Sequence, residues 1–264
     1  MQPVRSAASG ALSEAGSAAA SLPSLLGRFY ATSLEILRCL VTTRFESREF
    51  LSQSWFLVSI SIVPTIAMCV PFCIMFVYQI NMLLGEAGAV DLSGAGAGVA
   101  IIREIGPIIT VLVVAGAGAT AICADLGSRT IREEIDAMRV MGINPMQRLC
   151  VPRVIASTTV AVFLNGLVCM VGLVGGFFAT VYIEKASPGQ YVQAIPIITS
   201  LGDFFVSELK AGVFGMLAGL VGCHLGLNVK GGPKGVGDAV NQTVVVSFIL
   251  LFLANSVITT VALH

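Results

Sequence analysis

The sequence predicts an all-α membrane protein, in which an N-terminal interfacial amphipathic helix precedes five transmembrane helices. Hydrophobic residues occupy 56% of the 264 positions and charged residues only 11%, and the mean hydropathy is +0.91. A soluble chain of this length could not hide so much apolar surface from water. Crossing a hydrocarbon core takes about 20 residues at helical rise. Five apolar runs have about that length and lack the alternation of barrel strands: 55–80, 105–123, 154–183, 211–229 and 243–263.

The basic residues are distributed unevenly between the two sides of these runs. Five precede the first run, five lie between the second and third, and two lie between the fourth and fifth, whereas the other side holds only Arg103, Lys185 and Lys210. Basic residues accumulate in the cytoplasmic loops of membrane proteins. The distribution therefore predicts a plasma (inner) membrane protein with a cytoplasmic N-terminus and an extracytoplasmic C-terminus.

The residues before the first run divide into two parts. Residues 1–21 are rich in Ala, Ser and Gly, lack the features of a cleaved signal, and are expected to form a flexible tail. In residues 22–50, a helical projection places three charged side chains, Arg28, Glu35 and Arg38, opposite one broad apolar face: Leu22, Leu25, Leu26, Phe29, Leu37, Leu40 and Val41. Such a helix lies in the membrane interface. The alternative is a soluble amphipathic helix packed on a partner.

Residues 125–148 form a strongly charged stretch between the second and third runs. Thr130 and Glu133 have the spacing of a capping box, and Gly142 and Pro145 are stop signals for the helix. One stripe of this helix is apolar: Ile131, Ile135 and Met138. The pattern predicts a three-turn cytoplasmic helix whose stripe docks a soluble partner. The alternative is a connector that lies against the protein's own helix ends.

Prolines and glycines mark the spans themselves. Pro64 and Pro71 each remove a backbone hydrogen bond and predict a bent first helix. This helix would part from the second and leave a cavity lined by Val70, Ile74, Val77 and Tyr78. Small-residue ridges let helix backbones approach closely in lipid. They occur at Gly172/Gly176, Gly215/Gly219 and Gly222/Gly226, and serve either packing within one bundle or a subunit interface.

Several motifs suggest chemistry that their context excludes. The segment GAGATA at 116–121 imitates a dinucleotide fingerprint, but lies among membrane-length runs instead of alternating strands and helices. The segment GVGD at 235–238 lacks the second intramembrane aspartate that a protease dyad requires. His224 is a packing residue or a functional ionisable group. The seven cysteines lack metal or redox spacing and are predicted to be buried thiols. The sequence therefore predicts neither an enzyme nor a metal site.

Residues 103–153 resemble the signature of the MlaE/YrbE permease family. The shared pattern consists of R-E-I-G-P at 103–107, a small-residue span, E-x-I-D-A-M-x-V-M-G-I-N-P at 133–145, and V-P-R at 151–153. The similarity extends over residues 50–262, and residues 231–245 are most similar to the A-type YrbE permeases associated with Mce proteins in actinobacteria. Ala117 and Asp125 depart from the pattern, since many members carry Arg and Glu there.

The resemblance implies a permease domain at 51–264 that transports lipid, with import as the favoured direction. The helix between spans two and three would be a cytoplasmic coupling helix that docks an ABC ATPase dimer, through Ile131, Glu133, Glu134, Ile135, Asp136, Met138, Met141 and Gly142. This chain has no G-x-x-x-x-G-K-S/T loop and would hold no cofactor, because ATP and Mg would be bound by the ATPase. The remaining partners would be a second, B-type YrbE permease, extracytoplasmic Mce proteins and a lipid substrate, with no nucleic acid.

A lipid carrier needs an apolar cavity with a few polar groups at its mouth. The path would pass the outer ends of spans one and two, along Val70, Ile74, Val77, Tyr78, Asn81, Arg103 and Glu104. Two other classes remain open. An ion-coupled secondary transporter would need ionisable groups near mid-span, where only His224 lies within the predicted runs. A non-transporting membrane scaffold would need no ATPase.

Overall fold

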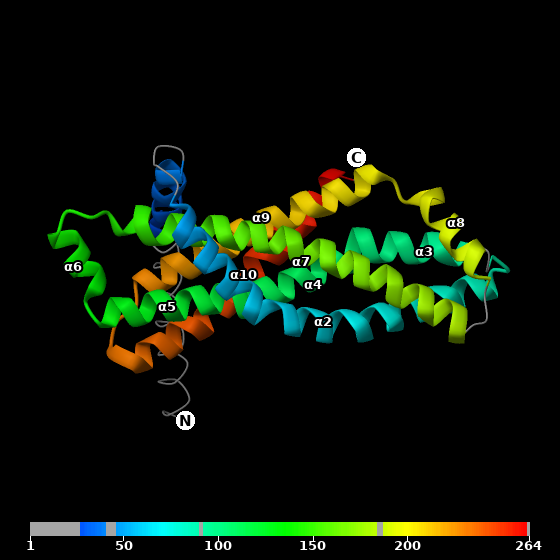
Figure 1. The fold of residues 1–264 in the computed structure, drawn as a ribbon, viewed down its shortest axis with the longest axis horizontal. Coiled ribbons are helices and arrows are strands. Elements are labelled where there is room, and N and C mark those ends of the chain that lie inside the picture. Colours follow the sequence, from blue (N-terminus) through cyan, green and yellow to red (C-terminus); the bar gives the residue numbers. More distant parts are fainter. Residues whose placement is uncertain (1–26, 41–45, 90–91, 184–186, 263–264) are drawn as a thin grey trace, which may run out of the picture.

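The structure is a computed structural model and describes residues 27–40, 46–89, 92–183 and 187–262. Within these ranges the chain is almost entirely helical and contains no strand (Figure 1). The predicted tail at 1–21 lies outside the described residues, as do Leu22, Leu25, Leu26 and Val41 of the predicted interfacial face.

Five helical stretches are long and apolar enough to cross a membrane, as the sequence predicts. The first is α2 (Ser47–Glu86), and the last two are α9 (Leu201–Leu227) and α10 (Gly232–Ala262). The second joins α3 (Ser93–Val99), η2 (Ala100–Ile105), α4 (Gly106–Val113), η3 (Val114–Ala119) and α5 (Thr120–Ile131). The third joins η4 (Met146–Cys150), α7 (Val151–Phe178) and η5 (Ala179–Ile183), where η marks a π-helical turn.

Every spanning stretch begins earlier than its apolar run. The second begins at Ser93 instead of 105, and α9 begins at Leu201 instead of 211. The apolar runs stop at charged residues, but the helices continue through Arg103 and Lys210. The protein is therefore a multi-pass membrane protein with charged side chains inside its helices.

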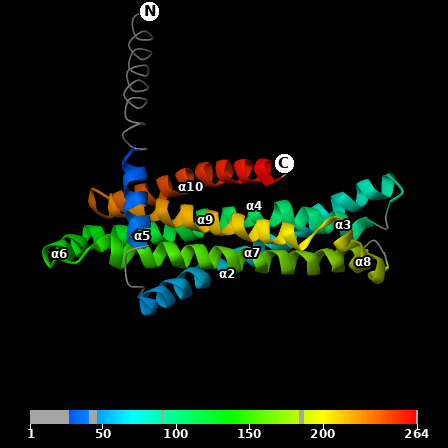
Figure 2. The same ribbon diagram turned by 90° about the horizontal axis from the view of Figure 1, so that it is seen from above.

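The helix α7 lies at the centre of the bundle. It packs against α2 on one side and α9 on the other, and α9 also contacts α5 and α10. A short helix, α8 (Pro188–Ile198), packs on α3 at one end (Figure 1). Its buried Tyr191 hydroxyl donates to the Leu173 carbonyl at 3.4 Å, and burial raises the pKa of Tyr191 to about 12. The ends of α2, α3 and α7 beside α8 extend beyond the end of α10 in both views (Figures 1 and 2).

The helix at 27–40 crosses the opposite end of the bundle, roughly perpendicular to the spanning helices (Figure 2). Its inner face centres on Ile36, which is buried, and Phe29, which packs on the core, whereas Arg28 and Glu35 are exposed. Leu37 is half-buried and Leu40 is exposed, so these two residues of the predicted apolar face do not belong to the face that packs on the bundle. The spanning helix α2 begins at Ser47, before the predicted boundary at residue 50.

The three small-residue ridges all pack within the chain. A Cβ at Gly172 would meet Ile101, one at Gly222 would meet Ala119, and one at Gly215 would lie 2.4 Å from the Ser157 carbonyl oxygen. Gly176, Gly219 and Gly226 likewise face other elements of the same bundle. The ridges thus serve packing within one bundle.

Gly215→Ala is therefore expected to destabilise the fold by about 1–3 kcal/mol, because its methyl group would force α9 away from α7. The matched control is Gly175→Ala in α7, where an added Cβ would meet no atom within 4 Å. Thermal unfolding in detergent compares the two. Equal melting temperatures would show that the α7–α9 contact is looser than described.

Candidate functional site

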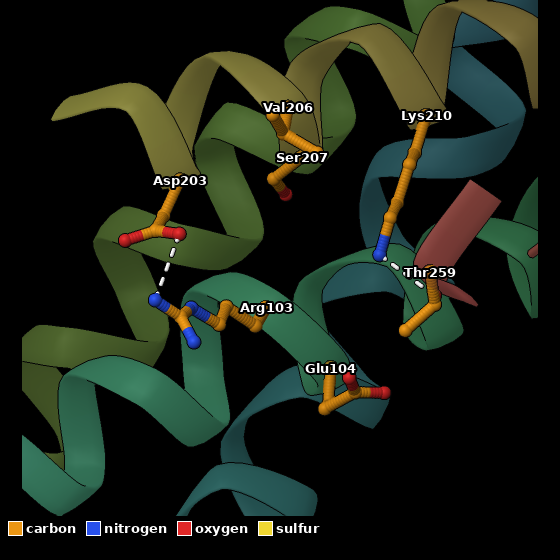
Figure 3. A pocket seen from close by; sticks show the side chains of 7 residues that line it. All are labelled: Arg103, Glu104, Asp203, Val206, Ser207, Lys210 and Thr259. Carbon is orange, nitrogen blue, oxygen red and sulfur yellow. Dashed lines mark hydrogen bonds and ion pairs between the residues drawn. The ribbon is translucent and has the colours of Figure 1, made fainter. Parts of the chain in front are cut away.

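A cavity of about 270 Å³ opens between the second spanning stretch, α9 and α10 (Figure 3). Charged and polar side chains from three helices point into it. The lining residues are Arg103 and Glu104 of η2, Asp203, Val206, Ser207 and Lys210 of α9, and Thr259 of α10.

The R-E-I-G-P motif folds into the π-helical turn that carries two of these side chains. The Gly106 N–H bonds to the carbonyl of Ile101, five residues back. Pro107 has no N–H, and its ring would clash with the carbonyl of Arg103 in a regular α-helix. A wider turn before the proline relieves this conflict, and such turns are frequent at functional sites. The motif therefore sets the local backbone that presents Arg103 and Glu104.

Two cations and two carboxylates line this cavity, but only one cation and one carboxylate are in contact. Arg103 Nη2 lies 2.9 Å from Asp203 Oδ1, and Asp203 also accepts from the Ser200 N–H at 2.8 Å, which fixes it at the start of α9. Lys210 is buried, and its Nζ donates to Thr259 Oγ1 at 2.9 Å. Among the described residues Lys210 has no ion-pair partner. An ammonium inside a membrane helix without a contacting carboxylate is costly, which makes Lys210 a candidate for holding a ligand.

The structure brings together only two of the predicted lipid-path residues, Arg103 and Glu104. They do not lie at the outer end of their helix, because it begins at Ser93, roughly 15 Å away along the axis at about 1.5 Å per residue. The apolar run starts only at residue 105, so the sequence pattern placed the start of the helix beside Arg103 instead of at Ser93. The same error hid Asp203 and Lys210, although their i, i+7 spacing places both on one helix face.

The other predicted lipid-path residues do not share a cavity. Val77 is fully buried, and Asn81 donates to Thr180 Oγ1 at 3.0 Å. Val70 lines a shallow apolar groove with α7, and Tyr78 is exposed. Ile74 is half-buried on α2. Although α2 contains Pro64 and Pro71 and changes direction (Figure 1), it packs on α7, so the predicted cavity between spans one and two is absent from the described residues.

The charged stretch at the other end differs from the predicted three-turn helix. The helix α5 ends at Ile131, Glu133 adopts a left-handed conformation with φ 58°, and α6 (Glu134–Val140) makes only two turns. Thr130 forms no capping box, because its hydroxyl donates to the carbonyls of Leu126 and Gly226 instead. The break directs α6 away from α5 (Figure 1).

The predicted docking stripe packs largely on the protein itself. Ile135 is buried, Met138 is half-buried against the core, and Ile131 is half-buried. The alternative of a connector lying against its own helix ends therefore describes this stripe. The exposed apolar side chains follow it: Val140 is 90% and Met141 66% exposed, and Ile143 is also exposed. Glu133, Asp136 and Gly142 are exposed beside them, and Glu134 is half-buried.

Ion pairs connect α6 to α5 and α7. The fully buried Arg153 contacts Asp125, whose other oxygen lies 3.4 Å from Arg129 Nε. Glu134 then lies 3.9 Å from Arg129 and 3.1 Å from Arg132. This chain of alternating charges holds the base of α6 in a fixed position relative to the bundle.

The remaining ionisable candidates have packing contacts. His224 Nδ1 lies 3.1 Å from Thr32 Oγ1, and its ring packs edge-to-face with Phe29, which joins α9 to the helix at 27–40. As predicted, none of the seven cysteines forms a disulfide. Six of them are buried, and Cys39 is half-buried. The part of the chain that the structure describes contains no group of His, Cys, Asp and Glu side chains that could hold a metal.

A bundle of spanning helices that encloses a charged cavity and presents a short charged helix at one end has the architecture of a membrane permease. A family model described as Permease MlaE matches residues 50–261, which is most of the chain. The chain belongs to the MlaE permease family.

Relatives in other organisms carry corresponding names. A probable ABC transporter permease protein of Synechocystis is 33% identical over 168 residues, or 64% of this chain. Protein TRIGALACTOSYLDIACYLGLYCEROL 1, chloroplastic, of Arabidopsis thaliana is 31% identical over 187 residues, or 71% of this chain. A probable ABC transporter permease protein of Rickettsia conorii is 33% identical over 164 residues, or 60% of this chain. The matches span 64%, 52% and 61% of these relatives' own lengths, respectively.

Proposed function

We propose that this chain is the permease subunit of an ATP-driven, Mce-type lipid transporter that imports lipid, and that it is of the A-type YrbE subtype. The observation that carries the proposal is the charged cavity around Lys210, whose buried ammonium has no ion-pair partner among the described residues. The name of the Arabidopsis relative, which is that of a glycolipid, supports a lipid substrate.

An amphiphile fits this site better than a small polar solute does. Its head group would occupy the charged cavity, where Lys210 and the Arg103–Asp203 pair offer charge-assisted hydrogen bonds. Its acyl chains would begin at Val206, an exposed apolar side chain that lines the cavity.

The partners follow from the two ends of the bundle. A cytoplasmic ABC ATPase dimer, which would hold ATP and Mg, docks at α6, where Val140, Met141 and Ile143 are exposed. Extracytoplasmic Mce proteins engage the opposite end, beside α3 and α8 (Figure 1). A B-type YrbE permease completes the membrane part.

Affinity purification of the full chain from its native membrane tests this function. An ATPase subunit should copurify, and its ATP hydrolysis should rise in the assembled complex.

A second candidate, an ion-coupled secondary transporter, is favoured by Glu208 in α9, whose two buried carboxyl oxygens have no hydrogen-bond partner among the described residues. Transport that follows an ion gradient without an ATPase would select that candidate. A scaffold would show neither activity.

Docking of the ATPase at α6 predicts the effect of one double substitution. Val140→Asp with Met141→Asp should release the ATPase, because buried apolar anchors dominate protein interfaces. The control Arg139→Ala removes a charge whose ion pair with Asp136 is exposed, and should keep the ATPase bound. A pull-down measures both. If the double variant folds and retains the ATPase, α6 is not the docking site.

The proposed orientation is tested with single cysteines in a cysteine-free background. Exposed positions are available near each end, at Gln190 in α8 and Lys234 in α10. Gln190→Cys should react with a membrane-impermeant thiol reagent in intact cells, and Lys234→Cys should react only after lysis. The opposite labelling would reverse the topology.

A further inference from the structure

A second polar cavity, of about 360 Å³, lies at the end of the bundle where the helix at 27–40 crosses α9 and α10. Six of its lining residues have polar or charged side chains: Arg28, His224, Asn228, Lys230, Asp238 and Gln242. It shares no residue with the cavity around Lys210. None of its side chains is needed for ATPase docking or for the proposed lipid site.

A relay of hydrogen bonds positions the arginine of this cavity. The Asn228 side-chain Nδ2 donates to the His224 carbonyl at 2.6 Å, which directs Asn228 Oδ1 toward Arg28 Nη2 at 2.9 Å. Within the described residues, Arg28 and Lys230 have no ion-pair partner, although Asp238 lines the same cavity. The other N–H donors of the guanidinium remain available for a ligand.

The loop that carries Lys230 packs tightly against the first turn of α10. Gly231 and Gly232 have φ of 86° and 74°, and a Cβ at Gly235 would lie 1.8 Å from the Lys230 carbonyl oxygen. Glycine at 235 is therefore required for this approach. The tight turn holds Lys230 beside the first turns of α10, where Asp238 and Gln242 form the facing wall.

We infer that this cavity binds the head group of an anionic phospholipid as a resident ligand, distinct from the transported lipid. Two cations and one carboxylate leave a single net positive charge, which matches a phosphodiester better than doubly charged free phosphate. Asp238 and Gln242 can accept hydrogen bonds from head-group hydroxyls, as glycerol or inositol would offer. Basic pockets between spanning helices on the cytoplasmic side suit such head groups. The crossing helix is the one that the sequence predicts to lie in the membrane interface, where lipid phosphates are found.

That the bound phospholipid belongs to the cytoplasmic leaflet rests on the proposed orientation. That the cavity binds an anionic head group does not depend on the orientation. Bound phosphatidylglycerol is therefore measured directly, by native mass spectrometry of the complex extracted from nanodiscs that contain phosphatidylglycerol and phosphatidylcholine. The intact complex should retain phosphatidylglycerol selectively. Lys230→Gln and Arg28→Gln should each weaken retention by about tenfold, as expected for the loss of a charge-assisted hydrogen bond.

The matched control is Lys234→Gln, an exposed basic residue of α10 that does not line the cavity. It should keep the lipid. The inference would be overturned if Lys234→Gln lost as much phosphatidylglycerol as Lys230→Gln, or if Lys230→Gln retained all of it. It would also be overturned if inorganic phosphate alone raised the melting temperature of the complex as much as phosphatidylglycerol does. Because neither Lys230 nor Lys234 lines the Lys210 cavity, failure of the transport proposal would not be mistaken for failure of this one.

Discussion

Arg153→Ala is expected to lower the free energy of unfolding by about 2–5 kcal/mol, because a large buried side chain is truncated and a partly buried ion pair is broken. The Arg153 side chain is fully buried at the start of α7. Its guanidinium contacts Asp125 of α5 and donates to the Leu149 carbonyl at 2.9 Å. Removal of the side chain leaves both acceptors without this donor and a void between the two helices. The loss should also loosen α6, which is connected to Asp125 through Arg129.

Thermal unfolding in nanodiscs measures this effect, with Arg132→Ala as the matched control. Arg132 is 63% exposed and pairs with Glu134 at 3.1 Å, so its loss should cost no more than about 1 kcal/mol. Arg153→Lys should be intermediate, because an ammonium cannot reproduce both contacts of the planar guanidinium. Similar shifts for Arg153→Ala and Arg132→Ala would show that the buried pair does not hold α5 and α7 together.

Lys210→Met is expected to reduce bound lipid and lipid transport by about tenfold or more, on the scale of one lost charge-assisted hydrogen bond. Met keeps most of the volume and removes only the ammonium, so the α9–α10 contact should survive. Lys210 is a cleaner choice than Arg103, because Arg103→Met would also leave Asp203 unpaired at the start of α9.

The control for this variant is Lys234→Met, which removes an exposed ammonium from the same chain. Lipid that copurifies with each variant is quantified, and ATPase docking is checked in parallel. Docking should persist in Lys210→Met, because α6 lies at one end of the bundle and contributes no residue to the Lys210 cavity. Unchanged lipid in a folded Lys210→Met protein would remove the head-group role of this cavity.

Much of the fold could be predicted because it follows from apolar length and spacing. The five spans and the glycine ridges depend on local pattern, and the structure confirms both. The start of each helix could not be predicted, since Arg103 and Lys210 look like loop residues until tertiary partners surround them. Asp203, the partner of Arg103, lies a hundred residues away in sequence, and Thr259, the partner of Lys210, lies 49 residues away.

The short helix α6 shows a different limit. Glu133 adopts a left-handed backbone that the sequence does not signal with Gly or Asn, so a continuous helix was the natural expectation. Whether Ile135 faces the protein or a partner also depends on where the break directs α6. For the lipid path, the prolines of α2 predicted a bend, but the position of α7 against α2 determined that no cavity opened there.

Transfer of a fluorescent phospholipid by the reconstituted complex, with and without ATP, tests the central claim most directly. The permease is placed in proteoliposomes with the proposed ATPase and extracytoplasmic partners, and the Lys210→Met and Lys234→Met variants are compared with the unaltered chain. The account predicts ATP-dependent transfer that persists in Lys234→Met and falls to the level without ATP in Lys210→Met. Transfer that needs no ATP, or that proceeds undiminished in Lys210→Met, would contradict it.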